Sequence, residues 1–363
     1  IQAAAAREVA LGRLGDHQAL LGTIRGWSRT LLGVSVLAAF AGIVLREPLG
    51  ALMGVEEHAW AAGAVLPTGV LWMLLSLQRG VLQGLHAYAP VGLSIIGEAF
   101  GRLAFGLTIA LAAGGVTGVF LASPAAFLVT SVGLAMALTR RLSVAPEVEK
   151  TPPAAVRTLR TLMANGWVPI ISLALLALLQ NVDVIIARHE LGDDRAGSYA
   201  VAAVAAKVVI WVAIGVGLQL LPQATARAAA GEDPRPVLFR ALAVLAAVAA
   251  PSLLIFALFP RFVLSTAFGP DTVDAAPALF LLTLAMTLLA VAYLTVQYML
   301  ALGSVRFLWV LGAVAAIEIP LLFSGDSITG FATLVLGVQV VVASAVLTIG
   351  LRARPRPAMM PAA

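Results

Sequence analysis

The chain has 363 residues, a formal net charge of +5 and no cysteine. Hydrophobic residues make up 61% of it and charged residues only 11%, whereas soluble domains carry about 25% charged residues. The absence of cysteine excludes a disulfide framework and a thiolate metal site. This composition favours a membrane protein over a soluble enzyme.

The first residues, Ile1-Gln2 followed by four alanines, are apolar but too few to span a bilayer. A cleaved signal peptide would need a basic segment and then an apolar core, and neither is present here. We therefore interpret the start as the cytoplasmic end of a span whose upstream part is missing. On this interpretation the sequence is an N-terminally truncated fragment.

Apolar stretches separated by short loops follow along the rest of the chain. Runs of about 18 to 25 residues match the ~30 Å hydrocarbon core of a bilayer at a helical rise of 1.5 Å per residue. The stretches are 30–46, 59–78, 91–113, 115–138, 166–188, 197–222, 237–259, 276–300, 305–323 and 328–350. They predict an all-α polytopic membrane protein with about ten complete transmembrane helices plus a remnant.

Basic residues gather in every second loop. One set of loops holds Arg7, Arg13, Arg25, Arg29, Arg79, Arg140, Arg141, Lys150, Arg157, Arg160, Arg227, Arg235, Arg240, Arg306, Arg352, Arg354 and Arg356. The opposite set holds only Arg46, Arg188, Arg195 and Arg261. Because loops rich in Lys and Arg stay on the cytoplasmic side, the first set and the C-terminus are predicted to be cytoplasmic. A bacterial cytoplasmic membrane is the expected location.

The longest loop divides the predicted spans into two groups. It covers 139–165, is basic and contains Pro152-Pro153. We interpret it as a cytoplasmic linker between an N-terminal lobe, 1–138, and a six-helix C-terminal lobe, 166–350. A cytoplasmic tail, 351–363, completes the chain. In the first lobe, the first span and part of the second are expected to be missing.

Weak internal similarity supports two related lobes. Arg46, a short amphipathic run and Gly54 follow the first apolar stretch, and Arg261, a similar run and Gly269 follow the corresponding stretch of the second lobe. Both copies begin on the same predicted side. They would therefore be parallel repeats, related by an axis near the membrane normal.

Five ionisable residues fall inside the predicted spans: Glu98, Arg102, Asp183, Lys207 and Glu318. Each costs about 2.5–3.5 kcal/mol to insert, so such residues usually face a partner or a hydrated cavity. In one interpretation, Glu98 pairs with Arg102 and Asp183 with Lys207, and both pairs only hold helices together. In the other, the two cations attract an anionic head group in a cavity. The three acids then tune the charge or carry a coupling proton.

Two amides precede Asp183 on the same span. Gln180 and Asn181 could hydrogen-bond sugars of a substrate, and interhelical amide contacts are an equally good explanation. We therefore predict Arg102, Lys207, Asn181 and Gln180 as substrate-binding residues.

Signals for enzymatic chemistry are weak. The sequence has no P-loop, no HExxH pattern and no serine in a nucleophile-elbow context. The adjacent acids Asp193-Asp194 and Glu232-Asp233 are better explained as solvated turns. We expect no enzyme activity, no cofactor and no metal site.

Two segments resemble polysaccharide flippases. The stretch Arg79-Gly80-Val81-Leu82-Gln83-Gly84-Leu85-His86, with Glu98-Ala99-Phe100-Gly101-Arg102 after it, is similar to their fourth and fifth spans. Gln180-Asn181-Val182-Asp183 through Gly192, with Ala196-Gly197-Ser198-Tyr199-Ala200 after it, is similar to the start of their second lobe. These flippases belong to the multidrug/oligosaccharidyl-lipid/polysaccharide exporter superfamily, which includes O-antigen and lipid II flippases.

The resemblance implies two helical lobes around a central cavity and transport by alternating access. The implied substrate is an undecaprenyl-diphosphate-linked oligosaccharide, moved from the cytoplasmic to the outer leaflet for cell-surface polysaccharide synthesis. Implied partners are the lipid bilayer and a glycan polymerase or glycosyltransferases, and no nucleic acid. Alternatives are a cation-coupled multidrug exporter of the same superfamily and a non-transporting scaffold of a glycan-assembly complex. A membrane glycosyltransferase is the third.

Overall fold

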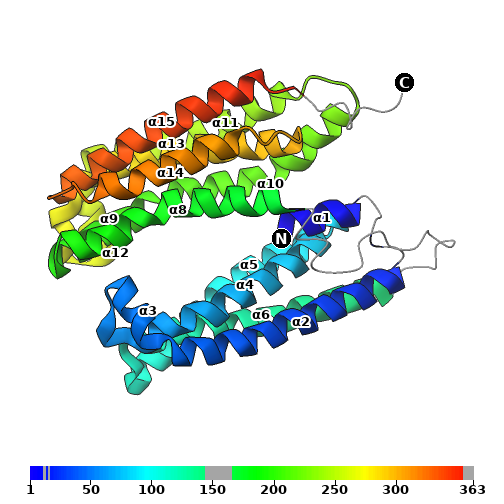
Figure 1. Ribbon diagram of the computed structural model, residues 1–363, viewed down its shortest axis with the longest axis horizontal. Helices are drawn as coiled ribbons and strands as arrows, with labels where there is room; N and C mark the ends of the chain where they lie inside the picture. The colour runs from blue at the N-terminus through cyan, green and yellow to red at the C-terminus, as the bar shows by residue number, and fades with distance from the viewer. Residues whose placement is uncertain (11–13, 15–16, 144–165, 355–363) are drawn as a thin grey trace. The chain divides into compact units, whose positions relative to one another are not determined.

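The computed structural model describes residues 1–10, 14, 17–143 and 166–354, and the chain forms two compact units, Ile1–Ile170 and Ile171–Ala363 (Figure 1). The helices of the first unit are α1 (Gln2–Ala10), α2 (His17–Val44), α3 (Arg46–Met53), η1 (Glu56–His58), α4 (Ala59–Gly84), α5 (Tyr88–Ile109), η2 (Ala110–Gly114) and α6 (Gly115–Ser143). Helix α8 (Trp167–Glu190) begins at the boundary of the second unit. That unit continues with α9 (Asp193–Ala206), α10 (Val208–Ala229), α11 (Arg235–Leu258), α12 (Pro260–Phe268), η3 (Pro270–Ala275), α13 (Ala276–Ala301), α14 (Phe307–Leu322) and α15 (Ile328–Arg352).

The described residues are helical and form no β-strand. Nine helical segments among them are long and apolar enough to cross a membrane, and α14 is apolar but shorter. These helices confirm the prediction of an all-α polytopic membrane protein. They correspond in order to the predicted apolar stretches, because length and hydropathy alone identify a spanning helix.

The structure differs from the predicted boundaries at several places. Helix α2 begins at His17 rather than at 30, because a polar first turn can extend a spanning helix beyond the apolar core. The stretch predicted as one span, 197–222, is interrupted at Lys207. Helix α6 continues to Ser143, into the predicted linker, and 144–165 lie outside the described residues.

Helix α4 is the centre of the first unit, where it packs against α1, α2, α3 and α6. Small residues allow the closest approaches. A Cβ added to Gly42 of α2 would lie 2.2 Å from the carbonyl oxygen of Gly63 on α4. On the same helix, Gly80 and Gly84 face the backbone of α1 in the same way. Gly80 and Gly84 are four residues apart, which is the small-xxx-small spacing of closely packed membrane helices.

We expect Gly42→Leu to destabilise the first unit by about 1–3 kcal/mol, the usual cost of overpacking. The atom in the way is a backbone oxygen of Gly63, so the helices must separate. Thermal unfolding in detergent micelles would show a lower midpoint. Gly33→Leu, on the same helix with no atom within 4 Å of the new Cβ, is the matched control. Equal midpoints for the two variants would contradict the close contact.

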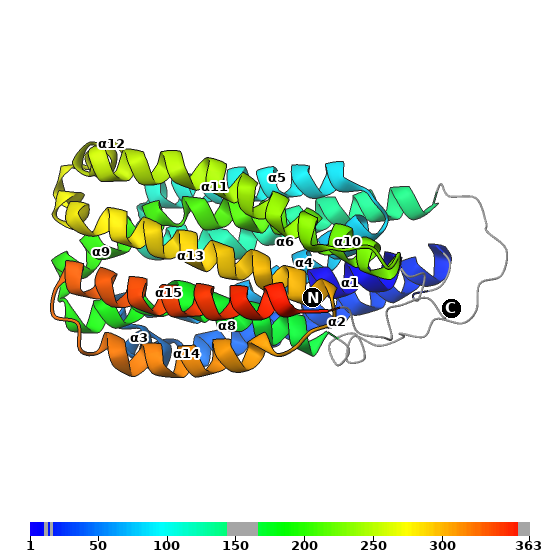
Figure 2. The ribbon, with the colours of Figure 1, turned by 90° about the horizontal axis from the view of Figure 1, so that it is seen from above.

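Helix α13 is the centre of the second unit and packs against α9, α10, α11 and α15. Figures 1 and 2 show α13 and α15 running side by side, with α11 on the other side of α13 in Figure 2. Most side chains of α13 are buried, including Leu279, Met286 and Val296. A spanning helix that is apolar and largely buried on all its faces is typical of the middle of a helix bundle.

Short helices follow α2 in the first unit and α11 in the second. Helix α3 begins at Arg46 and ends before Gly54, which has a left-handed φ of 67°. Helix α12 contains Arg261 and ends before Gly269, whose φ is 103°. Glycine suits both positions because other residues are strained at positive φ. The amphipathic runs noted in the sequence therefore form short helices in both units.

Candidate substrate and coupling sites

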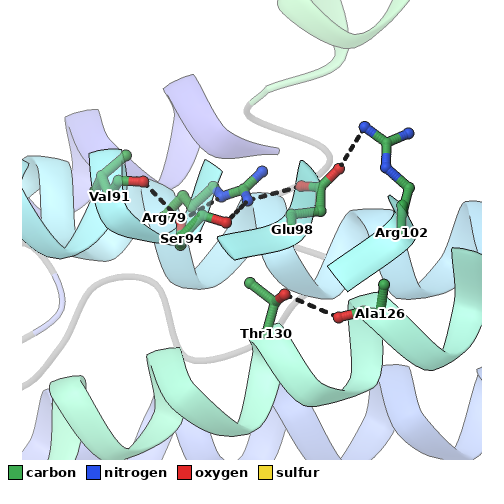
Figure 3. Close-up of polar contacts among 7 residues, drawn as sticks. All are labelled: Arg79, Val91, Ser94, Glu98, Arg102, Ala126 and Thr130. Carbon is green, nitrogen blue, oxygen red and sulfur yellow. Dashed lines mark hydrogen bonds and ion pairs between the residues drawn. The ribbon is translucent and has the colours of Figure 1, made fainter. Parts of the chain in front are cut away.

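A buried ion cluster joins α4 and α5 in the first unit (Figure 3). Arg79 donates to the hydroxyl of Ser94 at 2.8 Å, to its carbonyl oxygen at 3.1 Å and to Oε2 of Glu98 at 2.7 Å. Ser94 in turn donates to the carbonyl oxygen of Val91 at 2.7 Å. Arg102 contacts the other carboxylate oxygen of Glu98 at 3.2 Å. One carboxylate therefore bridges two guanidinium groups.

Arg79 is a correction to the sequence analysis, which placed it in a cytoplasmic loop. It lies inside α4, and its side chain is only 6% exposed. The predicted span was ended at 78 because an arginine normally marks the membrane surface. The sequence did contain a hint that Arg79 is buried. Glu98, inside a span, needs a buried cation as a partner, and Arg79 lies in the same pair of stretches that resembles the fourth and fifth spans of flippases.

The two arginines of this cluster differ in accessibility. The side chain of Arg102 is 47% exposed, and its guanidinium carbon lies 5.8 Å from the ring centroid of Phe127 on α6. Arg79 is enclosed and makes its hydrogen bonds to Ser94 and Glu98. With two cations and one anion, the cluster carries a net positive charge, and Arg102 is its more exposed cation.

Lys207 lies at the turn between α9 and α10 in the second unit. Its ammonium donates to Oδ1 of Asn181 on α8 at 2.9 Å, and Asn181 donates to the carbonyl oxygen of Ala177 at 2.7 Å. The pairing of Lys207 with Asp183 considered from the sequence is not a direct contact: the described residues contain no such ion pair within 4.0 Å, although the two charges still interact electrostatically. Lys207 is half-buried and has a neutral amide as its hydrogen-bond partner.

The separation of Lys207 from Asp183 follows from helix periodicity. Asn181 and Asp183 are two residues apart on α8, so their side chains point to different faces of the helix. Asn181 is exposed, whereas Asp183 is buried. Folding α8 and α9 into a hairpin matched the residues in depth but did not fix which face each one occupies.

Asp183 instead belongs to a buried acidic cluster. The hydroxyl of Tyr199 on α9 donates to Oδ2 of Asp183 at 2.7 Å, and the ring of Tyr199 packs edge-on against Phe331 of α15. Glu318 of α14 is fully buried and close enough to interact electrostatically with both Asp183 and Tyr199. Tyr199 was not among the predicted site residues, although the segment 196–200, which resembles flippases, contains it.

Several oxygens of this region have no hydrogen-bond partner among the described residues. They are Oδ1 of Asp183, both carboxylate oxygens of Glu318 and Oε1 of Gln339 on α15. The amide of Gln339 donates to the carbonyl oxygen of Leu179 on α8, one turn before Asp183, at 3.2 Å. Unsatisfied buried oxygens are costly, so this arrangement favours a bound proton or cation. Gln339 was also missed, although it is the single amide in an apolar span.

The remaining predicted residue, Gln180, lies half-buried on α8 without a hydrogen bond to the described residues. The described residues contain no group of three or more His, Cys, Asp or Glu side chains arranged to hold a metal ion. Another polar pair lies on α13, where Gln297 donates to the hydroxyl of Tyr293 at 2.8 Å. Both are buried, and Gly217 of α10 packs against the tyrosine ring.

Neither a protein-family model nor a curated protein matches the sequence. Solved structures do match over nearly its whole length. A MATE transporter in a bent conformation has a TM-score of 0.62 at 15% identity, covering 97% of this chain and 83% of that one. The MATE transporter ClbM in complex with Rb⁺ has a TM-score of 0.61 at 17% identity, with coverages of 98% and 82%.

This chain has the MATE fold. A MOP superfamily transporter from Pyrococcus furiosus, described as having a binding pocket of reverse polarity, matches too, with a TM-score of 0.60 at 15% identity and coverages of 97% and 84%. These matches support the predicted superfamily fold, multidrug/oligosaccharidyl-lipid/polysaccharide exporters. A shared fold at such low sequence identity does not identify the substrate.

Proposed function

We propose that this protein is a membrane transporter that moves an undecaprenyl-diphosphate-linked oligosaccharide from the cytoplasmic to the outer leaflet by alternating access. Arg102 and Lys207 contact the diphosphate during transport, while Asn181 and Gln180 contribute hydrogen bonds to the sugars. The lipid tail stays in the bilayer, and only the polar head group crosses through the protein.

The observation that carries this proposal is the unequal exposure of the deep charges. Arg102 and Lys207 are accessible, whereas Glu98, Asp183 and Glu318 are buried. An organic cation would need accessible acids, and a diphosphate needs accessible cations. Arginine and lysine are both established phosphate partners, through charge-assisted hydrogen bonds. The pattern therefore favours an anionic head group over a cationic drug.

The buried acids suit energy coupling. Asp183 and Glu318 are two carboxylates in one interior region, and no basic residue in the described part of the chain is bonded to either, although the charge of Lys207 acts on Asp183 from a greater distance. Two such charges close together in a low-dielectric interior repel each other strongly. We propose that a proton or a monovalent cation neutralises them in one transport state and leaves in another. Glu98, already held by two arginines, tunes the charge of its own cluster.

The function can be tested with a fluorescent undecaprenyl-diphosphate glycan in proteoliposomes that contain the full-length protein. We expect Arg102→Gln and Lys207→Gln each to slow flipping about tenfold, since a hydrogen bond to a charged group contributes about 1.5–3 kcal/mol. Dithionite quenching of the outer-leaflet label measures the rate. Arg141→Gln, which removes an exposed arginine near the end of α6, is the matched control and should flip at the wild-type rate.

Other outcomes would reject the proposal. Wild-type rates in both folded variants would reduce the two cations to structural residues, as a scaffold predicts. An intact protein that flips no glycan while a known flippase works in parallel would also contradict it. In that case the buried acids favour the second candidate, a cation-coupled drug exporter, and efflux of an organic cation driven by an imposed ion gradient would be the assay.

A further inference from the structure

An apolar groove of about 430 Å³ opens where α11 ends, α12 begins and α13 starts. Leu258, Phe259 and Phe262 line it on one side, and Pro277 lines it at the start of α13. Arg261 also lines the groove. All of these residues belong to the second unit. They lie at the end of its spans that faces the outer side of the membrane, as predicted from the distribution of arginines.

The surface of this groove is apolar and uncovered. Leu258, Phe259 and Phe262 are among the exposed large hydrophobic side chains, and Phe262 is 68% exposed. Leu264, on the opposite face of α12, is fully buried, so the short helix is anchored and its phenylalanines point away from the unit. At the end of a spanning helix, such a face lies in the interfacial layer of the bilayer, as other amphipathic helices do.

Arg261 is exposed in this apolar setting and has no ion pair or hydrogen bond with the described residues. Its counterpart in the first unit is different. Arg46 contacts Glu47 at 3.6 Å, and its guanidinium carbon lies 4.4 Å from the ring centroid of Trp60. The first unit therefore supplies both an anion and a stacked aromatic ring for its arginine, whereas the described residues of the second unit supply neither an ion pair nor a cation–π contact for Arg261.

We propose that the groove binds an anionic phospholipid of the surrounding leaflet. Arg261 receives the phosphate, and Leu258, Phe259 and Phe262 contact the upper part of the acyl chains. An anionic phospholipid is complementary to both features of the groove: its phosphate pairs with the arginine, and its acyl chains contact the phenylalanines. The site does not depend on which molecule the protein transports, so it can be measured without a transport assay.

Native mass spectrometry of the full-length protein tests the proposal. The protein is delipidated and titrated with phosphatidylglycerol or with phosphatidylcholine, and the lipid-bound fraction is measured. We expect tighter binding of phosphatidylglycerol and about fivefold weaker binding in Arg261→Gln, because one basic residue near an anionic surface contributes about 1 kcal/mol. Arg46→Gln is the matched control and should bind phosphatidylglycerol like the wild type, since Arg46 already has a protein partner.

Four outcomes would contradict the proposal. Equal binding of the two lipids by the wild type would exclude recognition of the charge. Equal loss in Arg261→Gln and Arg46→Gln would place the effect on general surface charge. Displacement of phosphatidylglycerol by one equivalent of a lipid-linked diphosphate glycan, absent in Arg261→Gln, would assign the groove to a transported substrate instead. Phe262→Asn, with Arg261 retained, should weaken binding of both lipids, and an unchanged affinity there would exclude the acyl-chain contact.

Discussion

Glu98→Gln should destabilise the protein by about 3–5 kcal/mol, the usual cost of removing one partner of a buried ion pair. The glutamine leaves the guanidinium of Arg79 without an anion inside the bundle, where its side chain is 6% exposed. The free energy of unfolding in mixed micelles, followed by tryptophan fluorescence, measures the loss. An unchanged free energy of unfolding would show that Arg79 reaches solvent.

The control for this effect is the second arginine of the cluster. Arg102→Gln removes the partly exposed partner of Glu98, and exposed ion pairs contribute only about 0–1 kcal/mol. The double variant Arg79→Leu/Glu98→Leu should be more stable than either single variant, because a matched apolar pair leaves no buried charge. A double variant whose loss equals the sum of the two single losses would contradict the pairing.

Asp183→Asn should slow flipping by roughly 5- to 150-fold, the range of a coupling energy of 1–3 kcal/mol, and should make the rate insensitive to an imposed ion gradient. The amide oxygen can still accept the hydrogen bond from Tyr199, so the contact between α8 and α9 is kept. The substitution also removes a buried carboxylate that forms no ion pair with a described basic residue. We therefore expect the free energy of unfolding to stay constant or to increase.

This combination separates a coupling role from a structural one. A purely structural Asp183 predicts reduced stability and a proportional loss of transport, and that result would reject the coupling proposal. Tyr199→Phe is the companion variant: it removes the hydroxyl that contacts Asp183 but leaves both carboxylates in place. It should retain a transport rate that responds to the gradient.

Much of the fold follows from the sequence. Each apolar stretch had to form a helix, because a backbone inside hydrocarbon must satisfy its own hydrogen bonds. The arginine, amphipathic run and glycine of α3 and α12 were visible in the sequence, but only the structure shows that these runs are helices. Helix boundaries were less certain. Arg79 shows why. A charged residue ends a span in a hydropathy profile, but its side chain can be buried in the helix bundle when it pairs with a buried glutamate such as Glu98.

Apart from Arg79, the sequence by itself determined which charges are deep, because depth depends only on distance along a helix of known rise. Only the tertiary structure decided their partners. Glu98 and Arg102 pair as their spacing of four residues on one helix predicted, since neighbours on a helix face are fixed by local geometry. Asp183 and Lys207 lie on different helices, and the rotation of each helix about its own axis settled the outcome. The packing of the whole unit sets that rotation. As a result, Lys207 donates a hydrogen bond to Asn181, and Asp183 accepts one from Tyr199.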